Sequence, residues 1–144
     1  MKLSPSAHKN IFLLTILLFA AALIVAAALA GSDEEKHRTY YDRYQAADEL
    51  FKTGQFDEPY NVYMELSAVY PDAYVLELKM AVCAMNMGMW PEAIEHSRRS
   101  MELYPLLTKD EDFMSSLSYS LQQLGEPEAA ERIRDYYYNF AALQ

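Results

Sequence analysis

The side chains that most often bind metal ions or perform acid–base chemistry are few in this sequence and lie far apart. The three histidines are His8, His37 and His96, and no spacing brings two of them onto one helix face with a carboxylate. Glu34 and His37 are three residues apart, but a zinc site needs three or four ligands. We therefore predict that the chain has no metal site.

Motifs for nucleophilic or phosphate chemistry are also missing from the sequence. Three of its four glycines lie at expected turns and form no phosphate-binding loop, and no serine has the setting of a nucleophile elbow. The acidic runs DEE and KDED lack the twelve-residue ligand spacing of a calcium loop. The one cysteine, Cys83, lies in the apolar stretch LELKMAVCAMNMG and is expected to be a small buried residue. We predict no catalytic site, no cofactor and no enzyme activity.

The distribution of charge narrows the choice of partners. All 21 acidic residues follow residue 31, together with 10 of the 12 Lys and Arg residues. Phosphate backbones repel so acidic a segment, and the sequence shows no surface of interleaved basic and aromatic residues. We therefore expect no nucleic acid partner and favour a protein partner.

Residues 11–30 form the most apolar stretch of the chain. It reads IFLLTILLFAAALIVAAALA, with 19 apolar residues and one threonine. A helix of this length spans roughly 30 Å, the thickness of the hydrocarbon core of a bilayer. We predict a single transmembrane helix here, because cleaved signal sequences usually have a shorter apolar core of about 7 to 15 residues. A signal peptide cleaved after Ala30 is the alternative, because Ala28 and Ala30 form a small-x-small pattern.

The charges that flank this stretch give its predicted orientation. The count of Lys and Arg on the two sides is nearly balanced, but Lys9 adjoins the apolar stretch while Asp33 and Glu34 follow it closely. The positive-inside rule then favours an inside amino terminus and an extracytoplasmic body. Small residues also recur every four positions on one helix face, a weak signal for helix pairing in the membrane, and these are Ala22, Ala26 and Ala30.

Glycines and prolines divide the rest of the chain into helix-sized pieces. The stretch GMWPEAIEHSRRSMELYP repeats the positions of the glycine, the aromatic residue and the closing proline in GQFDEPYNVYMELSAVYP, which lies 34 residues earlier. A third unit has its turn at Gly125, 37 residues beyond Gly88, so three residues are inserted in the loop LLTKD. A period of 34 residues is typical of stacked helix pairs. We predict an all-α domain over residues 40–144, with repeats at 40–73, 74–107 and 111–144.

Two capping-box patterns indicate further helix starts. SDEE begins at Ser32 and TKDE at Thr108, and in each pattern the hydroxyl and the glutamate can satisfy free amides at a helix start. The first pattern follows Gly31, so we expect the apolar helix to break there. Residues 1–10 would then be an amino-terminal flank, and residues 31–39 a junction that starts a new helix.

The second unit resembles the tetratricopeptide repeat family. After its turn glycine it has the aromatic Trp90, the small Ala93 and the closing Pro105. The first unit has Pro59 in place of that alanine, and the third unit has no closing proline. The resemblance covers residues 40–144 and implies an α-solenoid of three antiparallel helix pairs.

The resemblance also implies a groove, because the first helices of such pairs line a concave surface that holds another polypeptide. At the equivalent positions this groove is mostly apolar and aromatic, and its residues are Tyr41, Tyr44, Asp48, Phe51, Val75, Leu78, Lys79, Val82, Met85, Asp112, Ser115, Tyr119 and Gln122. Asp48 and Asp112 oppose the single cation, Lys79, so a clamp for a partner's carboxylate is not expected. An amphipathic helix or an extended apolar peptide fits better. The alternative is that Val75, Leu78 and Val82 merely pack between the units.

The last helix ends without the polar outer face that closes most repeat arrays. At about 100° per residue its aromatic side chains spread over more than one face, so at least one of them points outward. They are Tyr136, Tyr137, Tyr138 and Phe140. Covering one such ring removes about 150–250 Å² from water, so we expect a partner protein or a second copy of the chain to cover this end.

The sequence thus predicts a membrane-anchored interaction scaffold, an adaptor or assembly subunit of a membrane-associated protein complex. The alternative is a secreted soluble binding module that is released by cleavage after Ala30.

Overall fold

The computed structural model describes the backbone of residues 5–141 and the side chains of residues 14–26 and 35–136. Every regular element in this part of the chain is a helix, so the prediction of an all-α protein is confirmed. The α-helices are α1 (Pro5–Lys52), α2 (Asp57–Val69), α3 (Tyr74–Asn86), α4 (Trp90–Leu103), α5 (Glu111–Leu124) and α6 (Pro127–Ala141), and a 3₁₀ helix, η1 (Pro105–Lys109), lies between α4 and α5.

The chain divides into two compact units, Met1–Tyr41 and Asp42–Gln144. The first unit contains most of α1. The second contains the last turns of α1 and all the other helices.

The predicted helix break at Gly31 is wrong. Residues 31–39 all lie inside α1, so SDEE does not start a new helix. A glycine inside a helix costs only about 1 kcal/mol relative to alanine. The alanine-rich residues before Gly31 and the EEK sequence after it are strong helix formers, and they continue the helix across this position.

The predicted membrane location is also wrong. Within the described part of the chain, no helix combines the length and the apolar character that a membrane crossing requires. A single-pass protein with an inside amino terminus and an extracytoplasmic body is therefore not supported, and residues 11–13 and 27–30 lie outside the described side chains.

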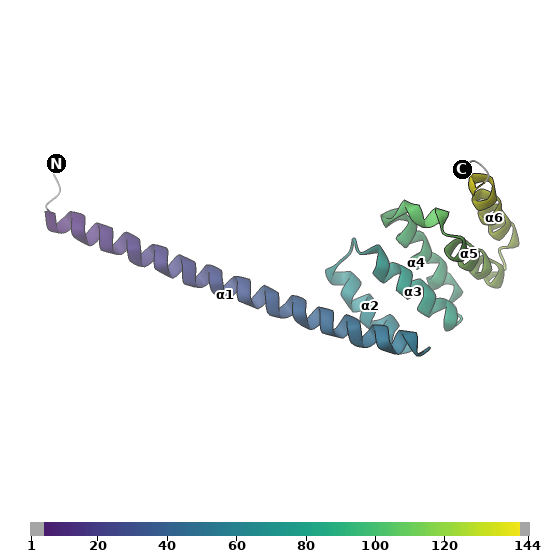
Figure 1. Cartoon of the computed structure of the whole chain (residues 1–144), viewed down its shortest axis with the longest axis horizontal. Helices are drawn as coiled ribbons and strands as arrows, with labels where there is room; N and C mark the ends of the chain where they lie inside the picture. The colour runs from purple at the N-terminus through teal and green to yellow at the C-terminus, as the bar shows by residue number, and fades with distance from the viewer. Residues whose placement is uncertain (1–4, 142–144) are drawn as a thin grey trace. The chain divides into compact units, whose positions relative to one another are not determined.

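In the second unit the helices follow one another as three packed pairs (Figure 1). Residues 42–52 of α1 pair with α2, where the rings of Tyr44 and Phe51 meet Tyr63. The helix α3 packs against α4, and α5 against α6. Contacts of α2 with α3, and of α4 with α5, join each pair to the next. The first helices of the pairs are therefore residues 42–52, α3 and α5.

The turns within the pairs share one backbone geometry. Gly54, Gly88 and Gly125 have φ angles of 80°, 74° and 87°, in the left-handed region that side-chain-bearing residues rarely adopt. Each glycine ends the first helix of its pair, as the recurring glycines of the sequence predict.

The start of α5 differs from the predicted capping box. Asp110, not Thr108, is the cap, because its Oδ1 accepts a hydrogen bond of 2.9 Å from the amide of Phe113. The Thr108 hydroxyl instead donates to the carbonyl of Pro105 inside η1, at 2.8 Å. The inserted residues thus form a short helix of their own that packs against α4, α5 and α6.

Small side chains lie where the helices approach most closely. Ala81, Ala84, Ala93 and Ala130 are all 0% exposed, so a larger side chain at these positions would push two helices apart. Cys83 is buried in the same layer, as its apolar sequence context predicts, and burial raises the pKa of its thiol to about 11.

Candidate partner-binding groove

The predicted groove residues of the second unit lie on the first helices of the three pairs. Seven of them are half-buried, namely Tyr44, Asp48, Phe51, Leu78, Lys79, Val82 and Met85. Five are exposed, namely Val75, Asp112, Ser115, Tyr119 and Gln122. None of these twelve is sealed in the core, so the first helices present a partly covered surface. Tyr41 is 62% exposed and belongs to the first unit.

A charged and aromatic cluster closes the part of this surface that lies between the first and second pairs. This Lys79 cluster consists of Lys79, Asp48, Tyr44, Phe51 and Tyr63. Lys79 Nζ donates to Asp48 Oδ1 at 2.5 Å and lies 4.5 Å from the centroid of the Phe51 ring. The rings of Tyr63 and Tyr44 lie 5.7 and 5.9 Å from the same nitrogen. The cation is thus held by groups of its own chain.

The opposite charges of the Lys79 cluster are paired with each other within the fold. The hydrogen bond from Lys79, supported by one from Lys52, holds the pKa of the Asp48 carboxyl below its ordinary value. Lys52 Nζ lies 3.0 Å from the other carboxylate oxygen of Asp48. The side chains of Lys79 and Asp48 are only 20% and 15% exposed, so this ion pair is shielded more than a surface pair. A partner's carboxylate would have to displace Asp48 to reach Lys79.

The hydroxyl of Tyr63 is a buried polar group without a partner. The residue is 0% exposed, and in the described part of the chain its Oη makes no hydrogen bond. Burial raises the pKa of this phenol above its ordinary value. An unsatisfied buried hydroxyl costs about 1–3 kcal/mol, so the ring of Tyr63 stabilises the cluster while its oxygen destabilises it.

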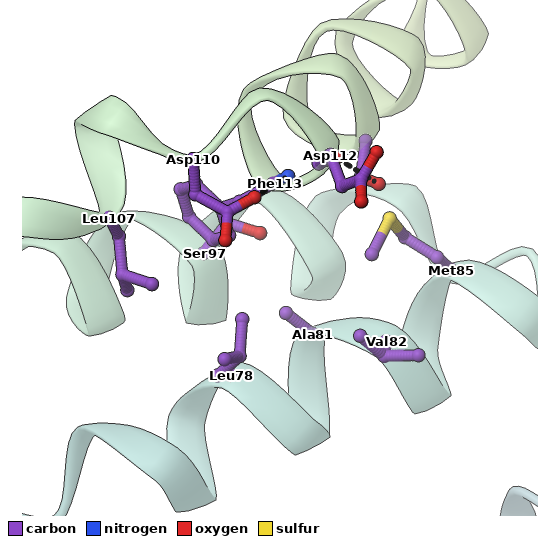
Figure 2. Close-up of a pocket in the computed structure, with 10 residues that line it drawn as sticks. Leu78, Ala81, Val82, Met85, Ser97, Leu107, Asp110, Asp112 and Phe113 are labelled. Carbon is purple, nitrogen blue, oxygen red and sulfur yellow. Dashed lines mark hydrogen bonds between the residues drawn. The ribbon is translucent and has the colours of Figure 1, made fainter.

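Between the second and third pairs the surface opens into a concavity, which we call the hollow (Figure 2). Its volume is about 230 Å³, and its lining residues are Leu78, Ala81, Val82, Met85, Ser97, Leu107, Asp110, Asp112, Phe113 and Ser116. Leu78 and Ala81 project from α3 toward Asp110 and Phe113 on the opposite side. The hollow thus has an apolar floor and two carboxylates at its edge.

Four predicted groove residues line the hollow: Leu78, Val82, Met85 and Asp112. The other lining residues were not predicted, although Leu78, Ala81, Val82 and Met85 follow the i, i+3, i+4, i+7 spacing of one helix face. Ala81 could have been found from that spacing. Leu107 comes from the inserted η1, and repeat equivalence offers no position for it.

The two carboxylates at the edge of the hollow differ in whether they bond to groups of their own chain. Asp110 caps α5 through the amide of Phe113 and is therefore committed to the fold. Asp112 is exposed in the first turn of α5, and no described side chain forms an ion pair or hydrogen bond with its carboxylate. No Lys, Arg or His lines the hollow.

An aromatic contact lies on the far half of α5. The ring of Tyr119 meets that of Trp90 edge to face, with the centroids 5.7 Å apart, while Tyr119 stays 52% exposed. Gln122, one turn further along the helix, is exposed. The predicted groove thus continues past the hollow as an open, partly aromatic surface.

A hydrogen-bonded chain of Tyr60, His96 and Glu77 was missed by the sequence analysis. His96 Nδ1 lies 2.8 Å from Glu77 Oε2, and its Nε2 lies 3.1 Å from the Tyr60 hydroxyl. An ionised carboxylate can only accept, so in the neutral ring Nδ1 donates to Glu77, and Tyr60 donates to Nε2. Tyr60 is 8% exposed, and we interpret the three bonded side chains as a link that holds α2, α3 and α4 together. Separations of 19 and 36 residues give no sequence signal for it.

The other predicted binding faces are described only in part. Tyr136 is 52% exposed on α6. The side chains of Tyr137, Tyr138, Phe140 and Ala30 lie outside the described residues. Ala22 and Ala26 are exposed in the first unit. Among the residues with described side chains, no group of three or more His, Cys, Asp or Glu is arranged to hold a metal ion.

Comparison with known proteins adds one finding to this geometry. The family model described as "Coatomer epsilon subunit" matches residues 44–138, about two-thirds of the chain, and these residues fall within the second unit. No individual curated protein matches the chain.

Proposed function

Because this chain belongs to the coatomer epsilon subunit family, we propose that it is a helical subunit of a protein complex and holds a partner polypeptide against its groove. The family supplies the coarse role, a helical component of an assembly. The finer proposal is that the second unit is a tetratricopeptide-like array of three helix pairs. The packed pairs and their three left-handed glycine turns support it.

The observation that carries the proposed role is the hollow. Its floor is built from Leu78, Val82, Met85 and Phe113, apolar side chains that meet at a concave surface open to solvent. Water at such a surface is released when a partner covers it, with a gain of about 25 cal/mol for each Å² of apolar area buried. Recognition of a helix or an extended segment in an apolar groove uses this same gain.

Binding accounts for the described residues better than catalysis. The titratable groups of the Lys79 cluster and of the Tyr60, His96 and Glu77 chain are bonded to one another. Neither group faces the hollow, and of the two carboxylates there Asp110 caps α5, which leaves Asp112 without a second available group for acid–base chemistry. We therefore propose a role without enzyme activity.

The carboxy-terminal helix supports a second, smaller contact. Tyr136 exposes about half of its surface on α6. A partner, or a second copy of the chain, would bury this ring with a gain larger than that of a surface ion pair. We propose that this face contributes to assembly alongside the groove.

Site-specific photo-crosslinking tests the proposed role. A photoreactive phenylalanine analogue replaces Ser115, which is exposed on α5 and belongs to the predicted groove. In a matched variant it replaces Arg98, which is exposed on α4 and was not predicted to line the groove. We expect crosslinks from position 115 to one partner protein in the native host, identified by mass spectrometry, and none to that partner from position 98. Equal capture from both positions, or from neither, would overturn the proposal.

A further inference from the structure

The residues inserted before α5 form η1, which packs against α4, α5 and α6. The helix α3 packs along both α2 and α4, and its Tyr74 and Leu78 pack against a cluster of Leu107, Phe113 and Met114 from η1 and α5. The hollow has α3 on one side and α5 on the other, and Ser97 of α4 lines it as well (Figure 2).

The size of the hollow limits what can occupy it. Sites for drug-sized ligands and cofactors usually enclose about 300–1,000 Å³, whereas the hollow has about 230 Å³ and an open mouth. It is therefore small for a cofactor, but it has room for one large side chain that enters from outside. An apolar side chain is favoured, because the floor offers Leu78, Val82 and Met85 as contacts.

The charge at the mouth limits the occupant further. Asp110, Glu111 and Asp112 are consecutive at the start of α5, and the amino-terminal end of a helix supplies only about half a unit of positive charge to offset them. Asp112 has no cationic partner among the described residues, and no basic residue lines the hollow. The one cation predicted for the groove, Lys79, is held by Asp48. A positively charged group on the occupant would therefore complement the mouth.

We infer that the hollow receives one bulky apolar side chain from a partner polypeptide, and that a lysine or arginine within about one helical turn of that side chain pairs with Asp112. The inference rests on the proposed partner-binding role and names the chemistry of the partner at this site. Met85 lies across from Asp112 (Figure 2), so in the proposed complex it would contact both the apolar side chain and the aliphatic stem of the basic one.

A random peptide library displayed on phage, selected against the full chain, tests the inference without knowledge of the natural partner. We expect the enriched peptides to share a Leu, Ile, Met, Phe or Trp with a Lys or Arg within four positions. A labelled peptide of the enriched sequence is then titrated with the full chain and its variants by fluorescence anisotropy.

Two substitutions separate the apolar contact from the charged one. Val82→Trp fills the hollow and is expected to abolish binding. Asp112→Lys places a cation beside the peptide's cation and is expected to weaken binding by about tenfold at low salt. Replacing the peptide's basic residue with glutamate should restore binding to Asp112→Lys and weaken binding to the parent chain.

Asp57→Lys is the matched control for the charge reversal. Asp57 is also an exposed residue in the first turn of a helix, α2. The carbonyls of Asp57 and Asp112 each accept a hydrogen bond from a side chain four residues later, from Asn61 at 3.0 Å and from Ser116 at 2.7 Å. The two reversals therefore change their helices alike, and only Asp112→Lys changes the hollow. Binding to Asp57→Lys should equal that of the parent.

The outcomes distinguish this inference from the proposed role. Enriched peptides without a basic residue, or binding that Asp112→Lys and Asp57→Lys change equally, would overturn the inference, and so would a selection that enriches nothing. If Val82→Trp fails to fold by circular dichroism, the charge exchange between peptide and Asp112 still decides. A specific crosslinked partner from position 115 would leave the proposed role standing in each of these cases.

Discussion

Replacing Tyr63 with phenylalanine should stabilise the protein. Tyr63 is 0% exposed and its hydroxyl makes no hydrogen bond among the described residues, whereas its ring packs 6.3 Å from Phe51 and 5.8 Å from Tyr44. Phenylalanine keeps these ring contacts and the position beside Lys79. It removes only the oxygen, whose burial without a partner costs about 1–3 kcal/mol. We therefore expect the free energy of unfolding to rise by about 1 kcal/mol or more.

The same helix provides the control with the opposite sign. Tyr60 lies one turn before Tyr63 and is 8% exposed, but its hydroxyl lies 3.1 Å from Nε2 of His96. Tyr60→Phe leaves that nitrogen without its donor and should lower the free energy of unfolding by about 1 kcal/mol. Both substitutions delete one phenolic oxygen from α2, so their opposite effects isolate the hydrogen bond.

Urea unfolding of the full chain at pH 7, followed by far-UV circular dichroism, measures both changes. In a domain of about 100 residues, each 1 kcal/mol corresponds to about 4–8 °C in the thermal midpoint. A loss of stability in Tyr63→Phe equal to that in Tyr60→Phe would show that the hydroxyl of Tyr63 is satisfied in solution, and the reasoning would fail.

Alkaline pH gives a second reading of the same group. Burial raises the pKa of Tyr63 in the folded state, so at alkaline pH the phenol ionises more readily in the unfolded chain than in the folded one. This difference has no effect on stability below the unfolded pKa of about 10, and it lowers stability as pH rises from there through the raised value. Stability above pH 10 should therefore fall less in Tyr63→Phe than in the parent chain.

Three further predictions concern the rest of the second unit. Lys79 lowers the folded-state pKa of Asp48, so this carboxylate stabilises the fold above pH 4, and the gain is lost as pH falls through the lowered value. Asp48→Asn should therefore lower the free energy of unfolding by about 1.5–3 kcal/mol at pH 7. Urea titrations at a series of pH values should also show a smaller loss of stability in acid for Asp48→Asn than for the parent chain. Burial raises the pKa of the Cys83 thiol to about 11, so a thiol reagent at pH 8 should label the unfolded chain in urea but leave the native chain unlabelled for as long as it stays folded. Gly88 has a φ of 74° with open space around it, so Gly88→Ala should cost about 1–2 kcal/mol through the backbone alone, while Gly88→Asn should cost less.

The helix pairs could be predicted because their signals are local. A left-handed turn accepts few residues other than glycine, so Gly54, Gly88 and Gly125 mark the pairs even where the intervening sequence differs. The resemblance to tetratricopeptide repeats implies a close helix contact at Ala93, which is 0% exposed. The same resemblance, carried over by equivalent positions, gave the groove residues of α3 and α5.

The features that the sequence did not predict depend on contacts between distant residues, or on helix propensities summed over many residues. The tie of Tyr60 to His96 and Glu77 joins three helices that no spacing relates. The hollow is lined in part by Leu107 of η1, an insertion for which repeat equivalence offers no position. At Gly31 the sequence pattern was present, but the helix formers on both sides outweighed it.

The two parts of the groove differ in whether their charged side chains are already paired within the fold. Between the first and second pairs, Lys79 and Asp48 neutralise each other under three rings, so binding a partner there would require breaking an ion pair that is only 15–20% exposed. Between the second and third pairs, an apolar floor and the Asp112 carboxylate have no such internal partner. A ligand therefore gains most from contacts at the hollow, where no ion pair has to be broken. The specificity of the groove should reside there, while the Lys79 cluster fixes α3, one of the helices that frame the hollow.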